Sequence, residues 1–353
     1  MHVSELDYEL PPELIAQRPV EPRDASRLLV CDRATQTHVH RHFYDLPEFL
    51  RPGDLLVAND TSVINARLHG HKPTGGKVEV LLLRKLDDLT WEALVGGRHV
   101  QQVIFSAGGD DNKTIRAEVV ARPSEAVFNV RFSEPIEPYL DVLGETPLPP
   151  YIHERLEDPA RYQTVYARVA GSAAAPTAGL HFTPQLIERI EAMGVRIAFV
   201  TLHVGLDTFK PIEEETVEAH KIHTEWCELL PATAEAINET RLRGGRVIAV
   251  GTTSARVLES CPLAAESGDR AGMSPSGQPA IVQPFSGFTS LYITPGYRWK
   301  VVDALITNFH LPRSTLLAMI GAFMGMDFMR CTYALAIRER YRFYSFGDAM
   351  LIL

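Results

Sequence analysis

Three histidines follow stretches of small or apolar residues, at positions where a strand or a loop should end: His181, His203 and His310. A neutral imidazole accepts a proton near pH 7, so histidines at the rim of a pocket are suited to general-base catalysis. Asp60 lies in the polar cluster after another apolar run and is a fourth candidate. These four residues form the predicted catalytic set, in which we place His181 and His203 ahead of His310, with Glu79 in reserve.

Hydroxyl, amide and small residues accompany these histidines and predict a binding pocket. In open parallel sheets, ligands bind outside the carboxyl ends of the strands, where turns from several strands meet. Any one of the turns could be an ordinary helix cap or packing loop, but their number favours a site. The predicted binding residues of these turns are Asn59, Thr61, Pro176, Thr177, Ala178, Gly179, Thr201, Gly205, Gly251, Thr252, Thr253, Ser254 and Asn308.

The stretch 251–254 opens a predicted helix, and free amides at a helix start suit an anion. Neither a P-loop motif nor a G-x-G-x-x-G fingerprint occurs in the sequence, so nucleoside triphosphates and dinucleotides are not indicated. His38, His40 and His42 share one strand face, but no cysteine or carboxylate accompanies them as a metal ligand. The pattern therefore predicts a metal-free site with histidine bases, hydroxyls, amides and an anion cradle.

The charge balance is acidic, with 35 basic and 44 acidic residues and a formal charge of −9. This balance excludes a uniformly positive surface but leaves room for a local basic patch. Arginines and aromatic residues interleave in 338–344, a pattern that can follow a phosphate backbone and stack a base, although a cationic helix end explains it equally simply. The candidate contacts to RNA are Arg18, Arg23, Arg27, Lys72, Lys77, Arg338, Arg340 and Arg342.

The four cysteines lie far apart and form no C-x-x-C pair. This spacing favours reduced thiols and a cytoplasmic setting over a disulfide framework or a zinc site. The N-terminus carries no signal-peptide pattern, and no apolar run is long enough to span a membrane. We therefore expect a cytoplasmic protein without a membrane partner.

The elements that would position these residues change character along the chain. Between residues 68 and 150, short β-type runs alternate with turn signals, which indicates a small antiparallel barrel. After about residue 160, predicted helices such as 184–193 and 232–243 alternate with buried strands such as 195–200 and 301–306. That alternation is typical of a mainly parallel sheet.

We therefore predict an α/β fold in which helices flank a mainly parallel sheet and an antiparallel β-barrel domain is inserted. Residues 1–67 and 151–353 would form the discontinuous α/β catalytic domain, and residues 68–150 the inserted barrel. Residues 263–280 are rich in alanine, serine, glycine and proline and predict a mobile loop.

Several long motifs resemble the S-adenosylmethionine:tRNA ribosyltransferase-isomerases of queuosine biosynthesis, almost from end to end. The matching stretches, in chain order, are RPGDLLV (51–57), NDT (59–61), YQTVY (162–166), APTAGLHF (175–182), LHVG (202–205), GTTS (251–254), TNFHLP (307–312) and YRFYSFGDAM (341–350). So many separated matches in the right order are specific. Asp207 departs from the small residue usual in the family, which affects the expected loop geometry.

The resemblance implies an α/β domain with an inserted β-barrel. It also implies that the ribosyl group of S-adenosylmethionine is transferred to 7-aminomethyl-7-deazaguanine at the tRNA wobble position and isomerised, which gives epoxyqueuosine-tRNA, adenine and methionine. S-adenosylmethionine is then a cosubstrate, no metal is needed, and tRNA is the partner of what we expect to be a monomer. The matched motif adds Tyr162, Gln163 and Thr164 to the expected binding residues.

Two other functions remain open from the sequence. One is a metal-free enzyme that transfers a nucleoside or ribosyl group to a small molecule, and turnover without tRNA would favour it. The other is a non-catalytic RNA-binding module built on the barrel. Loss of S-adenosylmethionine binding on changing the loop with Thr177 and His181 would argue against that module.

Overall fold

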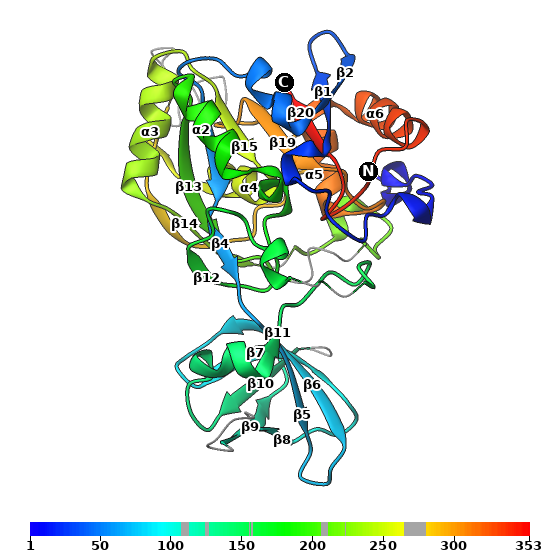
Figure 1. Cartoon of the computed structure of the whole chain (residues 1–353), viewed down its shortest axis with the longest axis vertical. Coiled ribbons are helices and arrows are strands. Elements are labelled where there is room, and N and C mark those ends of the chain that lie inside the picture. Colours follow the sequence, from blue (N-terminus) through cyan, green and yellow to red (C-terminus); the bar gives the residue numbers. More distant parts are fainter. Residues whose placement is uncertain are drawn as a thin grey trace.

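The computed structural model describes residues 1–106, 113–123, 127–154, 156, 158–205, 211–222, 224–264 and 280–353. Most of the predicted loop 263–280, and Asp207, lie outside these residues. Figure 1 shows a large body of helices and strands, which carries both termini, and a smaller barrel below it. None of the helices within the described ranges is long and apolar enough to cross a membrane.

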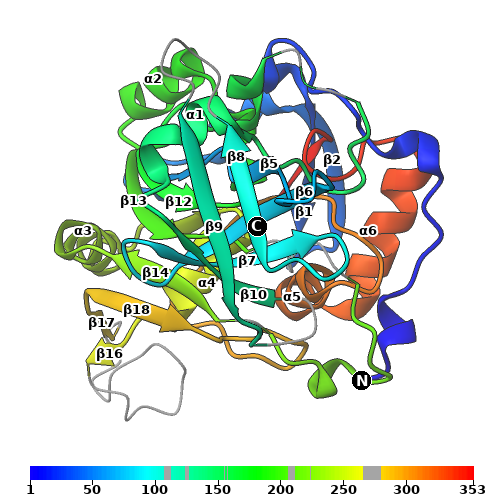
Figure 2. The same cartoon turned by 90° about the horizontal axis from the view of Figure 1, so that it is seen from below.

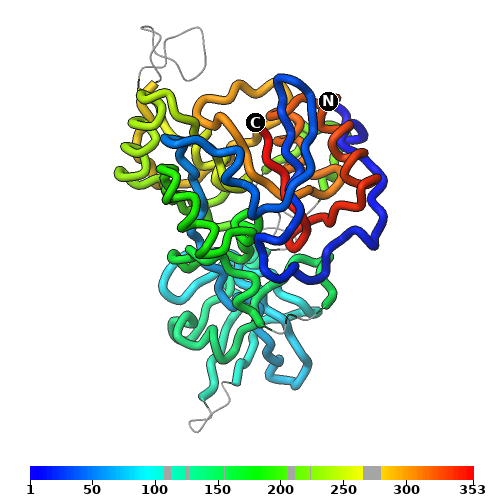
Figure 3. Tube along the Cα trace, turned by 45° about the horizontal axis from the view of Figure 1, so that its top comes forward, coloured from blue at the N-terminus to red at the C-terminus, as the bar shows by residue number. Residues whose placement is uncertain are grey.

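The large body is built on a nine-stranded mixed sheet. Its strands are, in spatial order, β18 (Phe285–Thr289), β14 (Glu225–Leu229), β13 (Arg196–Leu202), β3 (Leu55–Asn59), β15 (Val247–Val250), β19 (Ala304–Asn308), β20 (Ala349–Ile352), β1 (Arg27–Asp32) and β2 (Thr37–His42). The central strands β13, β3, β15 and β19 run parallel to one another, as predicted. The outer strands β14, β18 and β2 pair in antiparallel fashion. Figure 3 shows the blue N-terminal and red C-terminal segments side by side, where β1 pairs with β20.

Alternate residues of β3 enter two separate cores, one on each face of the sheet. Leu55 and Val57 pack in the core beneath α3 to α6, while Leu56 and Ala58 pack in the core beneath α2. All four are buried because both faces are covered, which explains the uninterrupted apolar run. The helices are α1 (Leu140–Leu143), α2 (Pro184–Ala192), α3 (Pro231–Leu242), α4 (Thr252–Ser260), α5 (Thr315–Met324) and α6 (Met326–Arg338).

The barrel forms from six antiparallel strands that close on themselves. Its strands are β5 (Arg67–His71), β6 (Lys77–Lys85), β7 (Thr90–Gly96), β8 (Gln102–Ser106), β9 (Thr114–Ala121) and β10 (Val127–Phe132), with β11 (Gly144–Glu145) added beside β5. Closure comes from the pairing of His71 in β5 with Ile104 in β8. Figure 2 looks at the barrel strands from below, in front of the large sheet. The predicted barrel is confirmed, while the exact domain limits at 67/68 and 150/151 stay a prediction.

The remaining elements are short. They are the strands β4 (Thr61–Val63), β12 (Val169–Ser172), β16 (Leu263–Ala264) and β17 (Ile281–Val282), and the 3-10 turns η1 (Val3–Leu6), η2 (Pro12–Leu14), η3 (Arg23–Ala25), η4 (Phe43–Phe49), η5 (Glu137–Tyr139), η6 (Pro159–Tyr162), η7 (Thr177–His181) and η9 (Val217–Ala219). β4 and β12 pair in parallel at the junction between body and barrel (Figure 1).

The strand expected at 301–306 begins later than predicted, at Ala304. The amides of Val301 and Val302 donate to the buried carboxylate of Glu259 at 2.9 and 3.0 Å, so they are not available to a neighbouring strand. Hydrogen bonds to this side chain of α4 therefore keep Val301 and Val302 out of the strand, although valine favours β-structure.

Candidate functional site

A cavity of about 1190 Å³ lies between the barrel and the large sheet. Arg84 and Trp91 line it from the barrel, and His203, Glu225 and Arg256 line it from the body. A smaller hollow of about 60 Å³ is lined by η7 and the ends of β15 and β19. The two spaces share Thr252 and Thr253 in their walls, so the start of α4 stands where they meet. The turns after the parallel strands therefore lie together, as the sequence predicts.

His203 lines the large cavity with its ring held on two sides. Its Nδ1 lies 2.8 Å from Thr61 Oγ1, and the ring stacks on Trp226 at 5.1 Å between centroids. Thr61 Oγ1 donates to the Val169 carbonyl, so it accepts from Nδ1–H, and Nε2 carries the basic lone pair. Among the described residues Nε2 has no hydrogen-bond partner. Burial lowers the pKa of His203, against a smaller opposing effect of Asp60, which favours the neutral base at pH 7.

His181 is fully buried, and both of its ring nitrogens are engaged. Nδ1 lies 2.7 Å from Ser26 Oγ, Asn308 Nδ2 donates to Nε2 at 3.1 Å, and the ring stacks on Phe43. Burial, together with the charges of two nearby arginines, lowers its pKa well below the ordinary value. These contacts suit His181 to orienting Asn308, whose Oδ1 accepts from Thr177 in the wall of the smaller hollow.

His310 also lines the smaller hollow, and its Nε2 lies 2.8 Å from Thr307 Oγ1. Burial lowers the pKa of His310 to about 3, so its imidazole is neutral at physiological pH. His310 is therefore near the predicted site but lies apart from His203, which faces the larger cavity.

Asp60 is buried, and each of its carboxylate oxygens is engaged. Arg168 donates to Oδ2 at 2.7 and 3.1 Å, and Thr201 donates to Oδ1 at 2.8 Å. Asn59 is equally engaged. Its Nδ2 donates to the Leu202 carbonyl and to the Thr253 hydroxyl, and its Oδ1 accepts from the Leu202 backbone N–H. Both residues therefore hold β3, β13 and α4 in register behind the cavity wall.

The motif residues Tyr162, Gln163 and Thr164 support the junction. Gln163 lines the large cavity, but its side chain is held by Val63: Oε1 accepts from the Val63 N–H at 3.0 Å, and Nε2 donates to the Val63 carbonyl at 2.7 Å. Tyr162 is fully buried and packs against Phe346, and Thr164 is buried beside Gly179. Gly179 is required there because a Cβ would lie 2.1 Å from the hydroxyl of Tyr166.

The predicted anion cradle is a helix start at which the Thr252 and Ser254 side chains are buried and Thr253 is half-buried. Gly251 adopts φ +89°, a conformation that favours glycine, and α4 begins at the next residue. Ser254 Oγ donates back to the Val250 carbonyl and is fully buried, so it faces away from the cavity. Thr252 and Thr253 line both spaces, and Gly205 lines the larger one.

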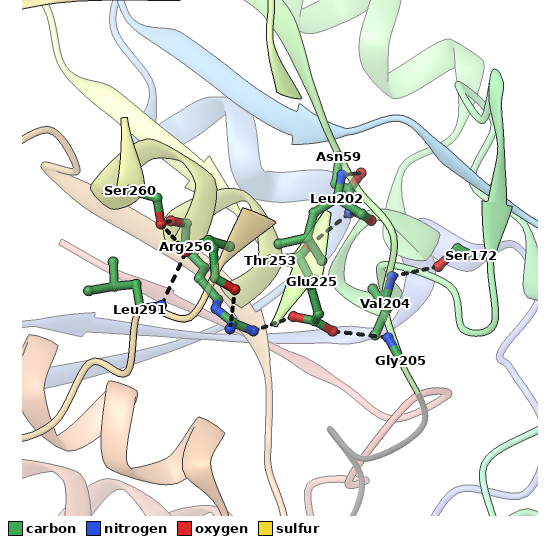
Figure 4. Close-up of polar contacts among 11 residues, drawn as sticks. Asn59, Ser172, Leu202, Val204, Gly205, Glu225, Thr253, Arg256, Ser260 and Leu291 are labelled. Carbon is green, nitrogen blue, oxygen red and sulfur yellow. Dashed lines mark hydrogen bonds and ion pairs between the residues drawn. The ribbon is translucent and has the colours of Figure 1, made fainter. Parts of the chain in front are cut away.

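Sequence reasoning missed the ion pair of Glu225 and Arg256. Both side chains are 8 % exposed, and Arg256 Nη1 donates to Glu225 Oε2 (Figure 4). Oε1 of Glu225 accepts from the Gly205 amide at 2.9 Å, and Arg256 Nη2 donates to the Thr289 carbonyl at 3.2 Å. The two residues lie 31 positions apart and outside the matched motifs, so only their contact in space reveals them.

The candidate RNA contacts fall into separate regions. Arg342 donates to the Arg18 carbonyl. Burial, followed by the nearby charges of Arg161 and Arg342, lowers the pKa of Arg23 to about 9. Arg23 itself is 8 % exposed and donates to the Leu180 carbonyl, which makes it the least accessible of the three. The other candidates are distributed as follows: Arg27 lies over the Tyr341 ring, Arg338 and Arg340 follow the end of α6, and Lys72 and Lys77 lie on the barrel. Glu79, the reserve base, pairs with Arg67 on the barrel.

Within the ranges that the structure describes, no three His, Cys, Asp or Glu side chains lie close enough together to hold a metal ion. The four cysteines are free thiols, with Cys331 exposed and Cys31, Cys227 and Cys261 buried.

The fold is that of an α/β body with an inserted barrel, and the cavity between them is lined by His203, whose imidazole burial keeps neutral. Residues 3–352 match the family described as "Queuosine biosynthesis protein". Curated proteins named S-adenosylmethionine:tRNA ribosyltransferase-isomerase, from Moorella thermoacetica and Symbiobacterium thermophilum, are each 51 % identical over 100 % of both chains. A crystal structure of S-adenosylmethionine tRNA ribosyltransferase from Thermotoga maritima is 38 % identical, covers 99 % of this chain and 100 % of its own, and superposes with a TM-score of 0.55. The chain belongs to the queuosine biosynthesis protein family.

Proposed function

We propose that this chain transfers the ribosyl group of S-adenosylmethionine to 7-aminomethyl-7-deazaguanine at the wobble position of a tRNA and isomerises it. The products are epoxyqueuosine-tRNA, adenine and methionine. Full-length identity of 51 % to proteins that carry this enzyme's name is the observation that supports it most strongly. Neither alternative function gains support from these relatives.

The cavity supplies the groups that this chemistry needs. A carbon beside a sulfonium is acidic, so a neutral imidazole can remove its proton. His203 offers Nε2 to the cavity, while Thr61 holds Nδ1 and Trp226 fixes the ring plane. We therefore assign the base to His203, and we assign to His181 the orientation of Asn308 and Thr177.

The start of α4 is suited to the carboxylate of the cosubstrate. Thr252 and Thr253 stand at the N-terminal end of a nine-residue helix, where the backbone amides and the helix dipole attract negative charge. The small residues 175–178 line the adjacent hollow and leave space for a flat ring close to the main chain.

The free thiols are typical of a protein that works in a reducing compartment, which supports a cytoplasmic location. The monomeric state is part of the proposal and can be tested by sedimentation.

The function is tested by product release with defined RNA. The purified chain is incubated with S-adenosylmethionine and either a tRNA carrying 7-aminomethyl-7-deazaguanine or the same tRNA with guanine. We expect adenine and methionine in equal amounts only with the modified tRNA, together with a mass increase of that tRNA. Adenine release at the same rate without tRNA would contradict the proposal and favour a small-molecule acceptor.

A further inference from the structure

The ion pair of Glu225 and Arg256 lies in the wall of the large cavity rather than in a sealed core. Both residues line that cavity, and their charged groups face each other across the gap between β14 and α4 (Figure 4). Burying two charges costs free energy, and apolar residues often replace such a pair without loss of stability. Its position beside a cavity is therefore better explained by ligand recognition than by folding alone.

The pair is directly connected to the proposed catalytic turn. Glu225 accepts from the Gly205 amide, two residues after His203, and the next residue along β14, Trp226, stacks on the His203 ring. Arg256 lies on α4, one turn after Thr252 and Thr253. One negative and one positive group thus lie on the same side of the cavity as the proposed base and the helix start.

We propose that Glu225 and Arg256 form the subsite for the α-ammonium and α-carboxylate groups of the methionine part of S-adenosylmethionine, an inference that rests on the proposed function. The zwitterion has the same two charges as the pair, so Glu225 faces the ammonium and Arg256 faces the carboxylate with no net charge added. The carboxylate then lies between Arg256 and the start of α4, where the helix dipole also favours it. A short aliphatic chain links this end to the sulfonium, which places the acidic carbon toward His203.

Affinity measurements with truncated ligands test this subsite. The probes are S-adenosylmethionine, its decarboxylated form, and the dimethylsulfonium derivative of 5′-deoxyadenosine, which keeps the sulfonium but lacks the amino acid. The wild-type chain should bind S-adenosylmethionine about 10- to 100-fold more tightly than either truncated probe, because charge-assisted hydrogen bonds are lost with the amino acid.

The variants Arg256→Lys and Glu225→Gln should remove that preference. Lysine keeps the charge but not the planar fork of arginine, so Arg256→Lys retains an ion pair that supports folding. We expect each variant to bind S-adenosylmethionine roughly 10-fold or more weakly, and the dimethylsulfonium probe within about 2-fold of wild type. Decarboxylated S-adenosylmethionine should be affected by Glu225→Gln but little by Arg256→Lys.

The matched control is Glu228→Gln, on the same strand β14 but not among the described residues that line the cavity. It should leave all three affinities unchanged. Equal weakening of every probe in the two variants, or no preference for S-adenosylmethionine in the wild-type chain, would overturn the subsite. If the wild-type chain binds none of the probes, the proposed function fails with it.

Discussion

Gly171 lies beside Nε2 of the proposed base, His203. It adopts φ +144°, and a Cβ built there would lie 2.8 Å from Nε2 of His203. Gly171→Ala should therefore strain the backbone and press on the nitrogen that takes the proton. We expect a rate lower by about 10- to 100-fold, since a small misplacement of a reacting group costs that much.

The control for this change is Gly296→Ala, at φ +98° with no atom within 4 Å of the added Cβ. It should lower stability by about 1–3 kcal/mol through backbone strain and leave the rate nearly unchanged. Steady-state kinetics and denaturant unfolding separate the two effects. A Gly171→Ala enzyme with the wild-type rate would show that Nε2 is not the reacting atom.

His310 should make the fold sensitive to acid. Burial lowers its pKa in the folded state to about 3, whereas in the unfolded chain it is close to 6.5. The unfolded chain therefore binds the proton first, so the stabilising contribution is complete above about pH 6.5 and is lost as the pH falls toward 3. The free energy of unfolding should fall by up to about 1.4 kcal/mol per pH unit for this one site.

Urea unfolding of the wild-type chain and of His310→Gln between pH 7.5 and pH 5 measures that contribution. The variant should be less stable at pH 7.5 but should show a shallower decline as the pH falls. Parallel curves for the two proteins would mean that His310 does not carry the pH dependence.

At the residue scale, the sequence predicted part of the set that lines the two hollows, but not how each residue is used. His203, Thr177 and Asn308 follow strands or a turn, so their position could be inferred from the end of the element. That His181 has both nitrogens engaged depends on Ser26 and Asn308, which are 155 and 127 residues away along the chain. Such long-range contacts leave no local signal in the sequence.

At the element scale, Glu259 determines how β19 begins. Its carboxylate accepts from the amides of Lys300, Val301 and Val302 and from the hydroxyl of Tyr297. Glu259→Ala would leave these buried donors without an acceptor, so we expect a loss of roughly 3 kcal/mol or more in the free energy of unfolding. Chemical denaturation gives the value, and a loss below about 1 kcal/mol would show that water replaces the carboxylate.

The elements themselves were largely predictable because their patterns are local. The apolar run of β3, with hydrophobic residues on both faces, predicts a buried parallel strand. Thr183 before Pro184 predicts the start of α2, and Thr183 Oγ1 indeed accepts from the Leu186 amide. The short pairing of β4 with β12 was not predicted, because it joins residues 61–63 to residues 169–172.

At the scale of the whole molecule, tRNA must reach the cavity despite the net charge of −9. Arg340 has a side chain that is 69 % exposed, and its carboxylate partner Glu13 lies as far as 3.9 Å away. Arg340→Ala should weaken tRNA binding and reduce the slope of log affinity against log salt by about one.

Arg243 is a matched control, with a 74 % exposed side chain and Glu239 at 3.9 Å on α3. Arg243→Ala should leave both affinity and salt slope unchanged. Filter binding over a series of salt concentrations measures them. If Arg340→Ala and Arg243→Ala behave alike, tRNA does not use the C-terminal part of the predicted patch.

The inserted barrel was predictable because the spacing of short β-type runs differs from the helix–strand alternation around it. The cavity was not, because it depends on how the barrel faces the sheet. Arg84 of the barrel lies 5.5 Å from the ring centroid of Phe288 in β18, and that contact across the two parts has no sequence pattern. The barrel side of the large cavity, and the pairing of Glu225 with Arg256, could therefore be assembled only from the structure.

The central claim is that Nε2 of His203 removes the proton from the ribose carbon beside the sulfonium. Hydrogen–deuterium exchange at that carbon, measured with tRNA present, tests it in wild type, His203→Ala and His181→Ala, with S-adenosylmethionine affinity measured alongside. Exchange in His203→Ala should fall by about 10²- to 10⁴-fold while cosubstrate binding is largely kept. Exchange at the wild-type rate in His203→Ala, with its loss confined to His181→Ala, would contradict the assignment.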